Sequence, residues 1–460
     1  MDTKWAGWAT PGTSATSDTA PLCARAHNAD LAALAVGIGA GAVVGTGYMM
    51  TAGTWTTPGG TATALGTLSA LLGTYLCLVL LLLIARLPWI EREVGQDRLI
   101  AMHRRFGPWA LVLIVAHVAL TTIGYAQASK TGLWAQLISL VTTYPWMVPA
   151  TVAFIAMVAL GLASIPAIRH RLAYETWWAG HLYFYLAVAL AFGHQLTSGT
   201  IFSSHTLLRT SWVGLYVVVG LAILWGRVWL PLRSSLRHDL RVDRVEVEGP
   251  GVVSIYISGK KLPELNALGG QFFQWRFMTR HWWWQAHPYS LSAGANGSWL
   301  RITVKDLGDQ SGRLSDLRPG TRVIAEGPYG TFTALKRRGT EVVCFAAGVG
   351  ITPIRALLDD LPAGTNMTLV YRVRDLTPGD VALRDELEAI VLRRGWEIVY
   401  LLGGRDEHPM TVDYLTSVVP ELPQSDVYVC GPGGFTDSVC AAVKAMGVPD
   451  SRLHHESFAF

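Results

Sequence analysis

Four histidines lie in or beside two long apolar segments of this 460-residue chain, and their spacing repeats. His103 and His117 are 14 residues apart in the first segment, and His181 and His194 are 13 residues apart in the second. On a helix, each separation corresponds to roughly 20 Å along the axis. If both helices run in the same direction, the histidines fall into two pairs, each at one depth. Two imidazoles at one depth on neighbouring helices are what an iron porphyrin needs as axial ligands.

The four histidines therefore predict two b-type haems stacked across an apolar layer: one between His103 and His181, the other between His117 and His194. The alternative interpretation is that such histidines bond neighbouring helices or line an ion path. The spacing also raises a geometric problem, because 13 residues leave His194 roughly 140° from the direction of His181 on an ideal helix. We therefore expect that helix to twist or bend beside the glycines that precede these histidines, or its histidines to approach the haems differently.

The elements that position these histidines are predicted to be six membrane-spanning helices. Hydrophobic residues make up 51% of the chain and charged residues only 15%, which excludes an ordinary soluble protein. Apolar runs of about twenty residues are the signal for a span. The six expected spans cover residues 31–50, 64–85, 107–128, 149–168, 174–198 and 209–230.

The basic residues predict the orientation of these spans. Arginines cluster after the second, fourth and sixth spans, whereas the opposite loops carry only Lys130. Basic loops stay cytoplasmic, so we expect both termini and the soluble half in the cytoplasm, and the chain as a multi-pass protein of the cell membrane. The net charge of +4 is small and lies beside apolar runs, so the expected partner is the lipid bilayer and not a nucleic acid.

The five cysteines form no CxxC pair or metal-type spacing, so neither a zinc site nor a disulfide framework is predicted. Residues 1–27 are rich in Thr, Ala, Ser and Gly and lack the pattern of a cleaved signal peptide; we expect a disordered tail. The six-span domain is then expected over residues 28–232, followed by a soluble half that is large enough for two domains.

The soluble half contains a series of short motifs in a fixed order. They are HPYS (287–290), GDQS (308–311), GPYGTF (327–332), AGVGITP (347–353), YRVRD (371–375), CGPGGF (430–435) and the terminal HHESFAF. In this order they resemble ferredoxin-NADP reductase-type flavoproteins, and the resemblance covers nearly everything after Arg237. It implies an antiparallel β-barrel that binds FAD over residues 233–336, and a parallel α/β domain that binds the nicotinamide nucleotide over residues 337–460.

For the flavin, the resemblance implies that the Tyr289 ring packs on the isoalloxazine and that the Ser290 hydroxyl bonds its edge. His287 stands where most of the family has arginine, and His-Pro (with Pro288) is the form found in transmembrane relatives. GDQS resembles the pyrophosphate turn, and GPYGTF resembles the motif that closes the barrel. The residues expected at the flavin pyrophosphate are Gly308 and Ser311.

A β-branched run, a glycine turn and a helical pattern follow one another around residues 341–358. A strand, a glycine turn and a helix N-terminus together form a site for a nucleotide pyrophosphate, although a glycine pair alone usually marks only a turn. The residues expected at this site are Gly348, Gly350, Thr352 and Pro353.

Arg372 and Arg374 could bind the 2′-phosphate of NADPH through their guanidinium groups; alternatively, they are surface arginines of an NADH enzyme. The family resemblance implies that a terminal aromatic, here Phe460, covers the flavin where nicotinamide docks; the alternative is a frayed end. The family resemblance also implies that a strand end, formed by Cys430, Gly431 and Pro432, lies beside the nicotinamide. Hydride transfer needs no nucleophile, so Cys430 is not expected to act as one.

The tryptophan run at 282–284 has two interpretations of equal weight: it rests on the membrane or the sixth span, or it forms a buried turn of the barrel. No calcium-loop pattern or added regulatory domain is present, so activity without an obligatory protein partner is expected.

Taken together, paired histidines and a flavin module resemble the NADPH oxidase and ferric reductase superfamily. The resemblance implies electron transfer from cytoplasmic NADPH through FAD and two haems to an acceptor outside, either O2, giving superoxide, or a ferric chelate. The histidine spacings favour O2, whereas Thr121 stands where oxidase relatives often carry a second histidine. Two other hypotheses remain: a transporter or channel with a redox-sensing cytoplasmic domain, and a haem-carrying assembly subunit.

Overall fold

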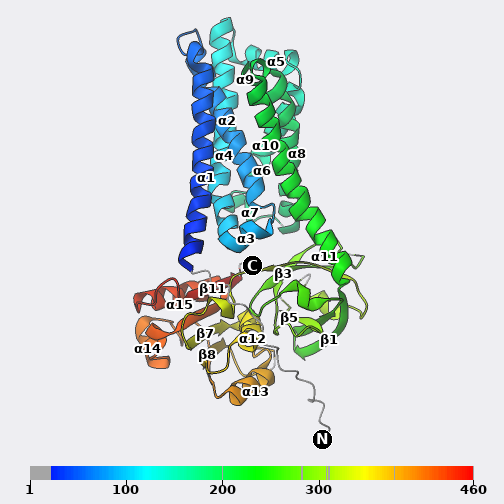
Figure 1. Cartoon of the computed structure of the whole chain (residues 1–460), viewed down its shortest axis with the longest axis vertical. Helices are drawn as coiled ribbons and strands as arrows, with labels where there is room; N and C mark the ends of the chain where they lie inside the picture. Colours follow the sequence, from blue (N-terminus) through cyan, green and yellow to red (C-terminus); the bar gives the residue numbers. More distant parts are fainter. Residues whose placement is uncertain are drawn as a thin grey trace.

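The computed structural model describes residues 22–172, 174–198, 200–280, 283–306, 308, 311–377 and 379–458. The helical half and the soluble half are stacked along the long axis of the molecule, with the long helices side by side at one end and the sheets at the other (Figure 1). Apolar helices come first, then an antiparallel β domain, then an α/β domain. At this level the predicted fold class is confirmed.

The helical half is built from six longer helices, which lie close to the six expected spans. These are α1 (Leu22–Thr51), α2 (Gly60–Leu83), α4 (Gln96–Ser129), α6 (Met147–Ala163), α8 (Tyr174–Ser198) and α10 (Thr206–Ile223). Shorter helices are α3 (Pro88–Val94), α5 (Leu133–Thr143), α7 (Pro166–Arg169) and α9 (Thr200–Ser204). Residues 22–27 of the tail expected to be disordered are helical, and the rest of that tail lies outside the described residues.

Within the described part of the chain, four helices are long and apolar enough to cross a membrane. They are Ala33–Thr54, Gly60–Leu83, Arg98–Ser129 and Thr206–His238. The bent pair α5 and α6, which meet at 119°, gives a fifth if it is counted as one span. The 25-residue α8 is not among them, because its two histidines and Gln195 interrupt an otherwise apolar sequence.

Small residues bring α2 close to α4, the helix that carries His103 and His117. A Cβ atom added to Gly59 would lie 2.0 Å from the carbonyl oxygen of Gly124, and one added to Gly66 would lie 2.7 Å from Thr121 Oγ1. Small residues at such contacts let helix backbones approach closely inside a membrane. The close approach places backbone carbonyls of α2 within reach of the α4 histidines.

The chain leaves the helical half through one continuous helical connection. The α10 helix continues through the π-helical segment η2 (Leu224–Trp229) into α11 (Leu230–His238), which reaches the β domain (Figure 1). Arg322 of that domain donates a hydrogen bond to Ser235 Oγ, at 3.4 Å.

The β domain consists of two three-stranded antiparallel sheets around a shared core that includes Phe273, Trp275 and Ile255. One sheet has the order β1 (Arg241–Gly249), β2 (Val252–Ser258), β5 (Trp299–Lys305). The other has the order β4 (His287–Ser290), β3 (Phe272–Phe277), β6 (Val323–Tyr329). The sequence predicted one barrel; here isolated bridges, Arg241 with Arg322 and Leu291 with Ile302, join two sheets.

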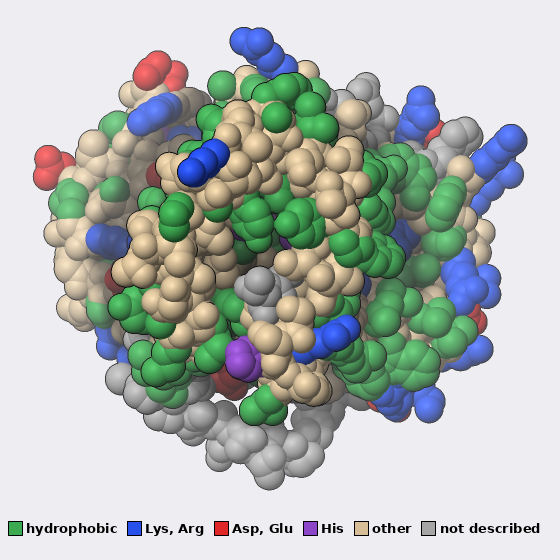
Figure 2. Space-filling view, turned by 90° about the horizontal axis from the view of Figure 1, so that it is seen from above, with side chains coloured by type: hydrophobic (Ala, Val, Ile, Leu, Met, Phe, Trp, Pro, Cys, Tyr) green, Lys and Arg blue, Asp and Glu red, His purple; other side chains and the backbone are tan. Residues whose placement is uncertain are grey.

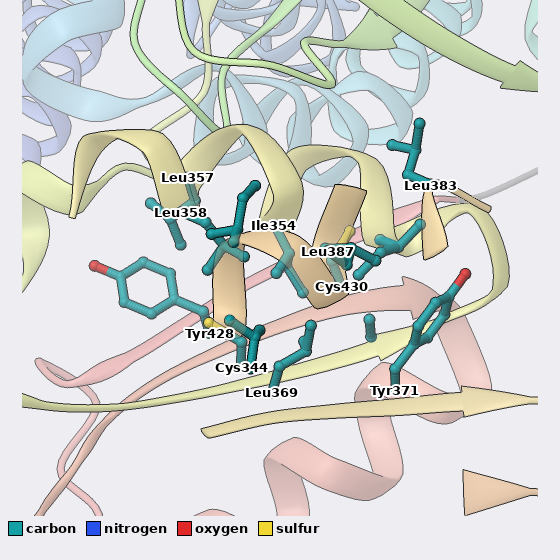
Figure 3. Close-up of a cluster of buried hydrophobic side chains, with 14 of the residues drawn as sticks. Cys344, Ile354, Leu357, Leu358, Leu369, Tyr371, Leu383, Leu387, Tyr428 and Cys430 are labelled. Carbon is teal, nitrogen blue, oxygen red and sulfur yellow. The ribbon is translucent and has the colours of Figure 1, made fainter. Parts of the chain in front are cut away.

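The α/β domain contains a five-stranded parallel sheet in the order β11-β10-β7-β8-β9. Its strands are β7 (Glu341–Ala347), β8 (Asn366–Val373), β9 (Glu397–Leu402), β10 (Asp426–Pro432) and β11 (Leu453–Phe458), and its helices are α12 (Ile351–Asp360), α13 (Arg384–Arg394), α14 (Val412–Val418) and α15 (Gly433–Ala445). Leu357 and Ile354 of α12 pack over Cys344 and Leu369 of the sheet (Figure 3). The strand order reverses between β7 and β10, and such a switch point is where open α/β sheets bind ligands.

Candidate functional site

The structure brings His103 of α4 and His181 of α8 together. Their ring centroids are 6.1 Å apart and their planes are inclined by 67°. A metal ion bound by one nitrogen of each imidazole at a usual metal–nitrogen distance would place the two centroids about 6 Å apart. The predicted pairing of these two histidines is therefore matched by a separation that fits one metal between them.

Hydrogen bonds determine which ring nitrogen of His103 is available to a metal. Its Nδ1 lies 3.2 Å from the carbonyl oxygen of Leu80 on α2. A carbonyl oxygen only accepts, so Nδ1 carries the proton and Nε2 keeps the lone pair that a metal requires. The ring of His181 is positioned by Ser164, whose Oγ lies 3.4 Å from His181 Nδ1 and accepts a hydrogen bond from Trp177 Nε1 at 3.2 Å.

His117 and His194 form the second predicted pair. His117 Nδ1 lies 2.9 Å from the carbonyl oxygen of Gly66, which again leaves Nε2 as the ligand atom, and Thr121 Oγ1 lies 3.2 Å from the same Nδ1. That His117 and His194 hold one haem between them stays a prediction. Among the described residues, His194 Nδ1 is a buried polar atom without a hydrogen-bond partner.

Viewed from the end remote from the sheets, the surface is mainly hydrophobic and uncharged, with a hollow near the centre (Figure 2).

The ligands that these pairs offer fit a haem. In the part of the chain that the structure describes, no three His, Cys, Asp or Glu side chains gather as a metal site, so each pair supplies two protein ligands. A metal held by only two protein ligands takes its other ligands from elsewhere, and a porphyrin supplies four. The glycines expected to bend the second helix do not break it, since α8 is continuous from Tyr174 to Ser198. Gly193 instead makes room for Trp146, whose ring would lie 2.6 Å from an added Cβ.

The predicted flavin motif forms β4. Tyr289 is partly buried, with its ring 6.1 Å from that of His287 and inclined by 27°, and its carbonyl oxygen accepts a hydrogen bond from Trp275 Nε1 at 2.9 Å. Burial raises the pKa of Tyr289 to about 12, so the phenol is neutral at physiological pH. Ser290 is buried, and its hydroxyl has no hydrogen-bond partner among the described residues. An orphaned hydroxyl beside Tyr289 fits the predicted role of bonding the edge of a bound flavin.

This orphaned hydroxyl gives a prediction for Ser290→Ala. Without FAD, the variant should be as stable as the parent or slightly more stable, because a buried unsatisfied group costs about 1–3 kcal/mol. With FAD, one hydrogen bond is lost, about 1 kcal/mol, so affinity should fall between fivefold and tenfold. Ser292→Ala is the control, since Ser292 accepts from Arg301 and Thr303 and its loss should destabilise both forms. Thermal unfolding and FAD titration measure the two effects; an apo form destabilised as strongly as Ser292→Ala would contradict the assignment.

The other flavin motifs lie around the same domain. Gly308 has a φ of 127°, and its amide donates to Asp306 at 3.0 Å; Ser311 Oγ donates to the carbonyl oxygen of Gly308 at 3.2 Å. A carboxylate thus already occupies part of the turn expected to hold pyrophosphate, and that role stays a prediction. Trp283 is exposed, which disagrees with the interpretation of a buried turn, and Trp282 lies outside the described residues.

The predicted nucleotide motifs meet at the switch point of the parallel sheet. Gly348 has a φ of 54°, and Gly350 packs so closely on β10 that an added Cβ would lie 2.3 Å from the carbonyl oxygen of Cys430. Thr352 and Pro353 begin α12 and are buried. The backbone around Gly348 has open space beside it, as a pyrophosphate at a helix N-terminus requires.

Residues around Cys430 and the chain end also lie at this edge of the sheet. The Cys430 thiol is fully buried in the core shown in Figure 3, and burial raises its pKa well above the ordinary value, so it is no nucleophile. In the register of β10 and β11, Phe458 pairs with Pro432 and Ser457 with Gly431. The last strand therefore ends beside the predicted nicotinamide position. Phe460 lies outside the described residues, so its role stays a prediction.

Of the two predicted phosphate-binding arginines, Arg372 is partly buried and Arg374 is exposed. The Arg372 guanidinium lies 4.6 Å above the Phe435 ring. Burial and the nearby Arg405 lower the pKa of Arg372. Sequence reasoning missed Arg405, which follows a glycine pair after β9 and carries no motif. Two neighbouring guanidinium groups at the ends of adjacent strands suit a phosphate dianion.

Two family models match the chain. The ferric reductase like transmembrane component matches residues 69–192, which include His103, His117 and His181 and end two residues before His194, and the oxidoreductase NAD-binding domain matches residues 345–441. A flavohemoprotein from Chromobacterium violaceum is 29% identical over 247 residues, 48% of this chain and 60% of that protein. A vanillate O-demethylase oxidoreductase from Pseudomonas putida is 32% identical over 161 residues, 34% of this chain and 48% of that protein. The chain spans about half the length of the curated relatives it matches.

Among solved structures, the flavohem-like FAD/NAD binding domain of nitric oxide dioxygenase from Vibrio cholerae is similar to this chain. It is 23% identical, with a TM-score of 0.39, and the match covers 48% of this chain and 98% of that domain.

Proposed function

Because one chain joins a ferric reductase-like transmembrane component to an NAD-binding oxidoreductase domain, we propose that it is a transmembrane oxidoreductase. Electrons pass from cytoplasmic NADPH, through FAD and two b-type haems, to O2 at the outer face, giving superoxide. The observation that carries this proposal is the 6.1 Å separation of the His103 and His181 rings, with Nδ1 of His103 bound to a carbonyl. Six spans and a cytoplasmic soluble half belong to the same proposal.

The residues of the soluble half have separate tasks in this scheme. Arg372 and Arg405 bind the 2′-phosphate, which favours NADPH over NADH, and the turn at Gly348 receives the pyrophosphate. Tyr289 and Ser290 orient the flavin from β4, while the end of β11 lies where nicotinamide approaches. Bound FAD would accept a hydride and release single electrons, which haem iron accepts one at a time.

In the helical half, the four imidazoles hold the two haem irons, and the carbonyls of Leu80 and Gly66 fix the rings of His103 and His117. Outward movement of an electron works against an inside-negative potential, at a cost of about 2.3 kcal/mol per charge per 100 mV. Oxidation of the nucleotide must supply that free energy.

A second candidate acceptor is a ferric chelate, which the description of the matched transmembrane family favours. Position 121, beside His117, is a threonine, whereas oxidase relatives often carry a second histidine there; this difference also favours a ferric chelate.

The purified full chain, loaded with FAD and haem, tests the proposal. Under anoxic conditions NADPH should reduce b-type haem, and kcat/KM should be higher with NADPH than with NADH. With O2 as sole acceptor, dye reduction sensitive to superoxide dismutase marks the oxidase; with a ferric chelate as sole acceptor, faster ferrous iron formation marks the reductase. A protein that binds no haem, or whose haem NADPH cannot reduce without a partner, would refute the proposed electron path.

A further inference from the structure

An ion pair between distant parts of the sequence joins the helical half to the β domain. Arg86, in the turn after α2, pairs with Glu326 of β6, 240 residues away. The two side chains are only 14% and 9% exposed, and Arg276 lies 3.7 Å from the same carboxylate. Burial also raises the pKa of Glu91, on the adjoining α3, to about 7. The junction is therefore shielded from water. Removal of either charge of the ion pair would leave the other charge buried without compensation, which is destabilising.

The turn that carries Arg86 is held rigidly. Arg86 has a φ of 58°, which is strained for a residue other than glycine. Behind it, Arg227 Nε donates to the carbonyl oxygen of Ile84 at 2.8 Å, and Gly226 packs so tightly that an added Cβ would lie 1.9 Å from the carbonyl oxygen of Ala85. Because the backbone around Arg86 is held by these contacts, the Arg86 side chain is directed toward the β domain.

On the β-domain side, the ion pair lies on the sheet that carries the flavin motif. Strand register aligns Glu326 with Gln274, and Gln274 with Pro288. The neighbouring row aligns Tyr329 with Phe272, and Phe272 with Ser290. Two strand spacings, about 10 Å, therefore separate the pairing residues from the flavin motif.

Arg86 contacts residues of both rows of this sheet, and the helix that precedes it contacts His103 of the inner histidine pair, His103 and His181. The Arg86 Cζ lies 5.3 Å from the centre of the Tyr329 ring, which is within the range of a cation–π contact. Six residues earlier in the chain, the Leu80 carbonyl oxygen accepts from His103. Strand pairings, the Arg86–Tyr329 contact, the chain from Arg86 back to Leu80 and the Leu80–His103 hydrogen bond thus connect Ser290 to His103.

The only covalent route from the helical half to the β domain is the α10–η2–α11 connection. A domain attached at one point can pivot about it. Arg237 and Glu264 form an ion pair at the end of that connection, but their side chains are 44% and 41% exposed. Exposed ion pairs contribute little to stability. The buried pair at Arg86 supplies a second, separate point of attachment.

We propose that Arg86 and Glu326 are positioning residues, whose ion pair docks the flavin-bearing sheet against the membrane half and fixes the distance from the flavin to the inner histidine pair. The inference rests on the proposed function. Neither side chain is assigned a part in hydride transfer.

The test compares Arg86→Met, Glu326→Gln and the double variant with the parent chain, and uses Arg237→Met as the matched control at the same junction. Reduction of ferricyanide by NADPH, which takes electrons at the flavin, should stay within twofold of the parent. Anoxic reduction of haem by NADPH should slow at least tenfold in each single variant, with no further loss in the double variant. Hydrogen–deuterium exchange of the peptides around residues 84–94 and 323–332 should accelerate, whereas Arg237→Met should change none of these.

Haem reduction at the parent rate, or unchanged exchange in both peptides, would overturn the proposal. Equal slowing of ferricyanide and haem reduction would also overturn it, because it would indicate general damage. If Arg86→Met does not fold, Glu326→Gln and Arg86→Lys carry the same test. If the parent itself reduces no haem, the proposed function fails, while the exchange measurement still decides whether this ion pair docks the two halves.

Discussion

Replacing His117 with alanine is expected to remove one haem and leave the other. His117 is held for ligation by the Gly66 carbonyl oxygen, and a haem that loses one axial imidazole keeps only one protein ligand. NADPH should still reduce the remaining haem, whereas reduction of the outer acceptor should fall to background. Haem content per flavin and the absorption spectrum measure the loss, and His194→Ala should reproduce it.

The pairing itself is tested by double variants. His117→Ala with His194→Ala should lose no more haem than either alone, because both changes empty the same site, whereas His117→Ala with His103→Ala should lose both haems. His205→Ala is the matched control, since His205 is an exposed histidine at the start of α10. Loss of both haems in His117→Ala, or full haem content in His194→Ala, would contradict the pairing.

The pairing of histidines could be predicted because helix rise converts sequence separation into depth, and apolar runs reveal the spans. The acceptors that orient the rings could not be predicted. Leu80 and Gly66 act through backbone carbonyls, which every residue has, and the close approach of α2 to α4 that brings them within reach depends on tertiary packing. The contact of Ser164 with His181 could not be predicted either, because a serine near a helix end can have many roles.

The short motifs of the soluble half could be placed because each combines a strand, a turn and a helix locally. What the sequence left out are the contacts between domains. Arg86 appeared only as one of several basic residues that indicate orientation, and its partner on β6 is far along the chain. α5 was also missed, since its 11 residues are too short for a span, although Pro145 marks the bend before α6.

Glu386 gives the largest expected effect on stability. It lies on α13 and pairs with Arg301 of β5, at 2.8 Å, and with Arg355 of α12. The two arginine side chains are only 5% and 6% exposed, whereas the Glu386 side chain is 32% exposed. It therefore binds the β domain to the α/β domain. Removal of one partner from a buried ion pair typically costs 3–5 kcal/mol, because it leaves a buried charge without compensation.

For Glu386→Gln we expect a loss of about 3 kcal/mol, at the lower end of that range, because Glu386 is partly exposed and each arginine keeps another acceptor. Arg301 still donates to the carbonyl oxygen of Ser292 at 2.6 Å, and Arg355 to Asp359 at 2.7 Å. The midpoint of the thermal transition that releases FAD should fall by about 6–12 °C. Glu388→Gln, two residues along the same helix, breaks an exposed pair with Arg384 and should cost less than about 0.5 kcal/mol. Equal midpoints for the two variants would show that the domains are held by apolar packing, with the buried arginines satisfied by their remaining acceptors.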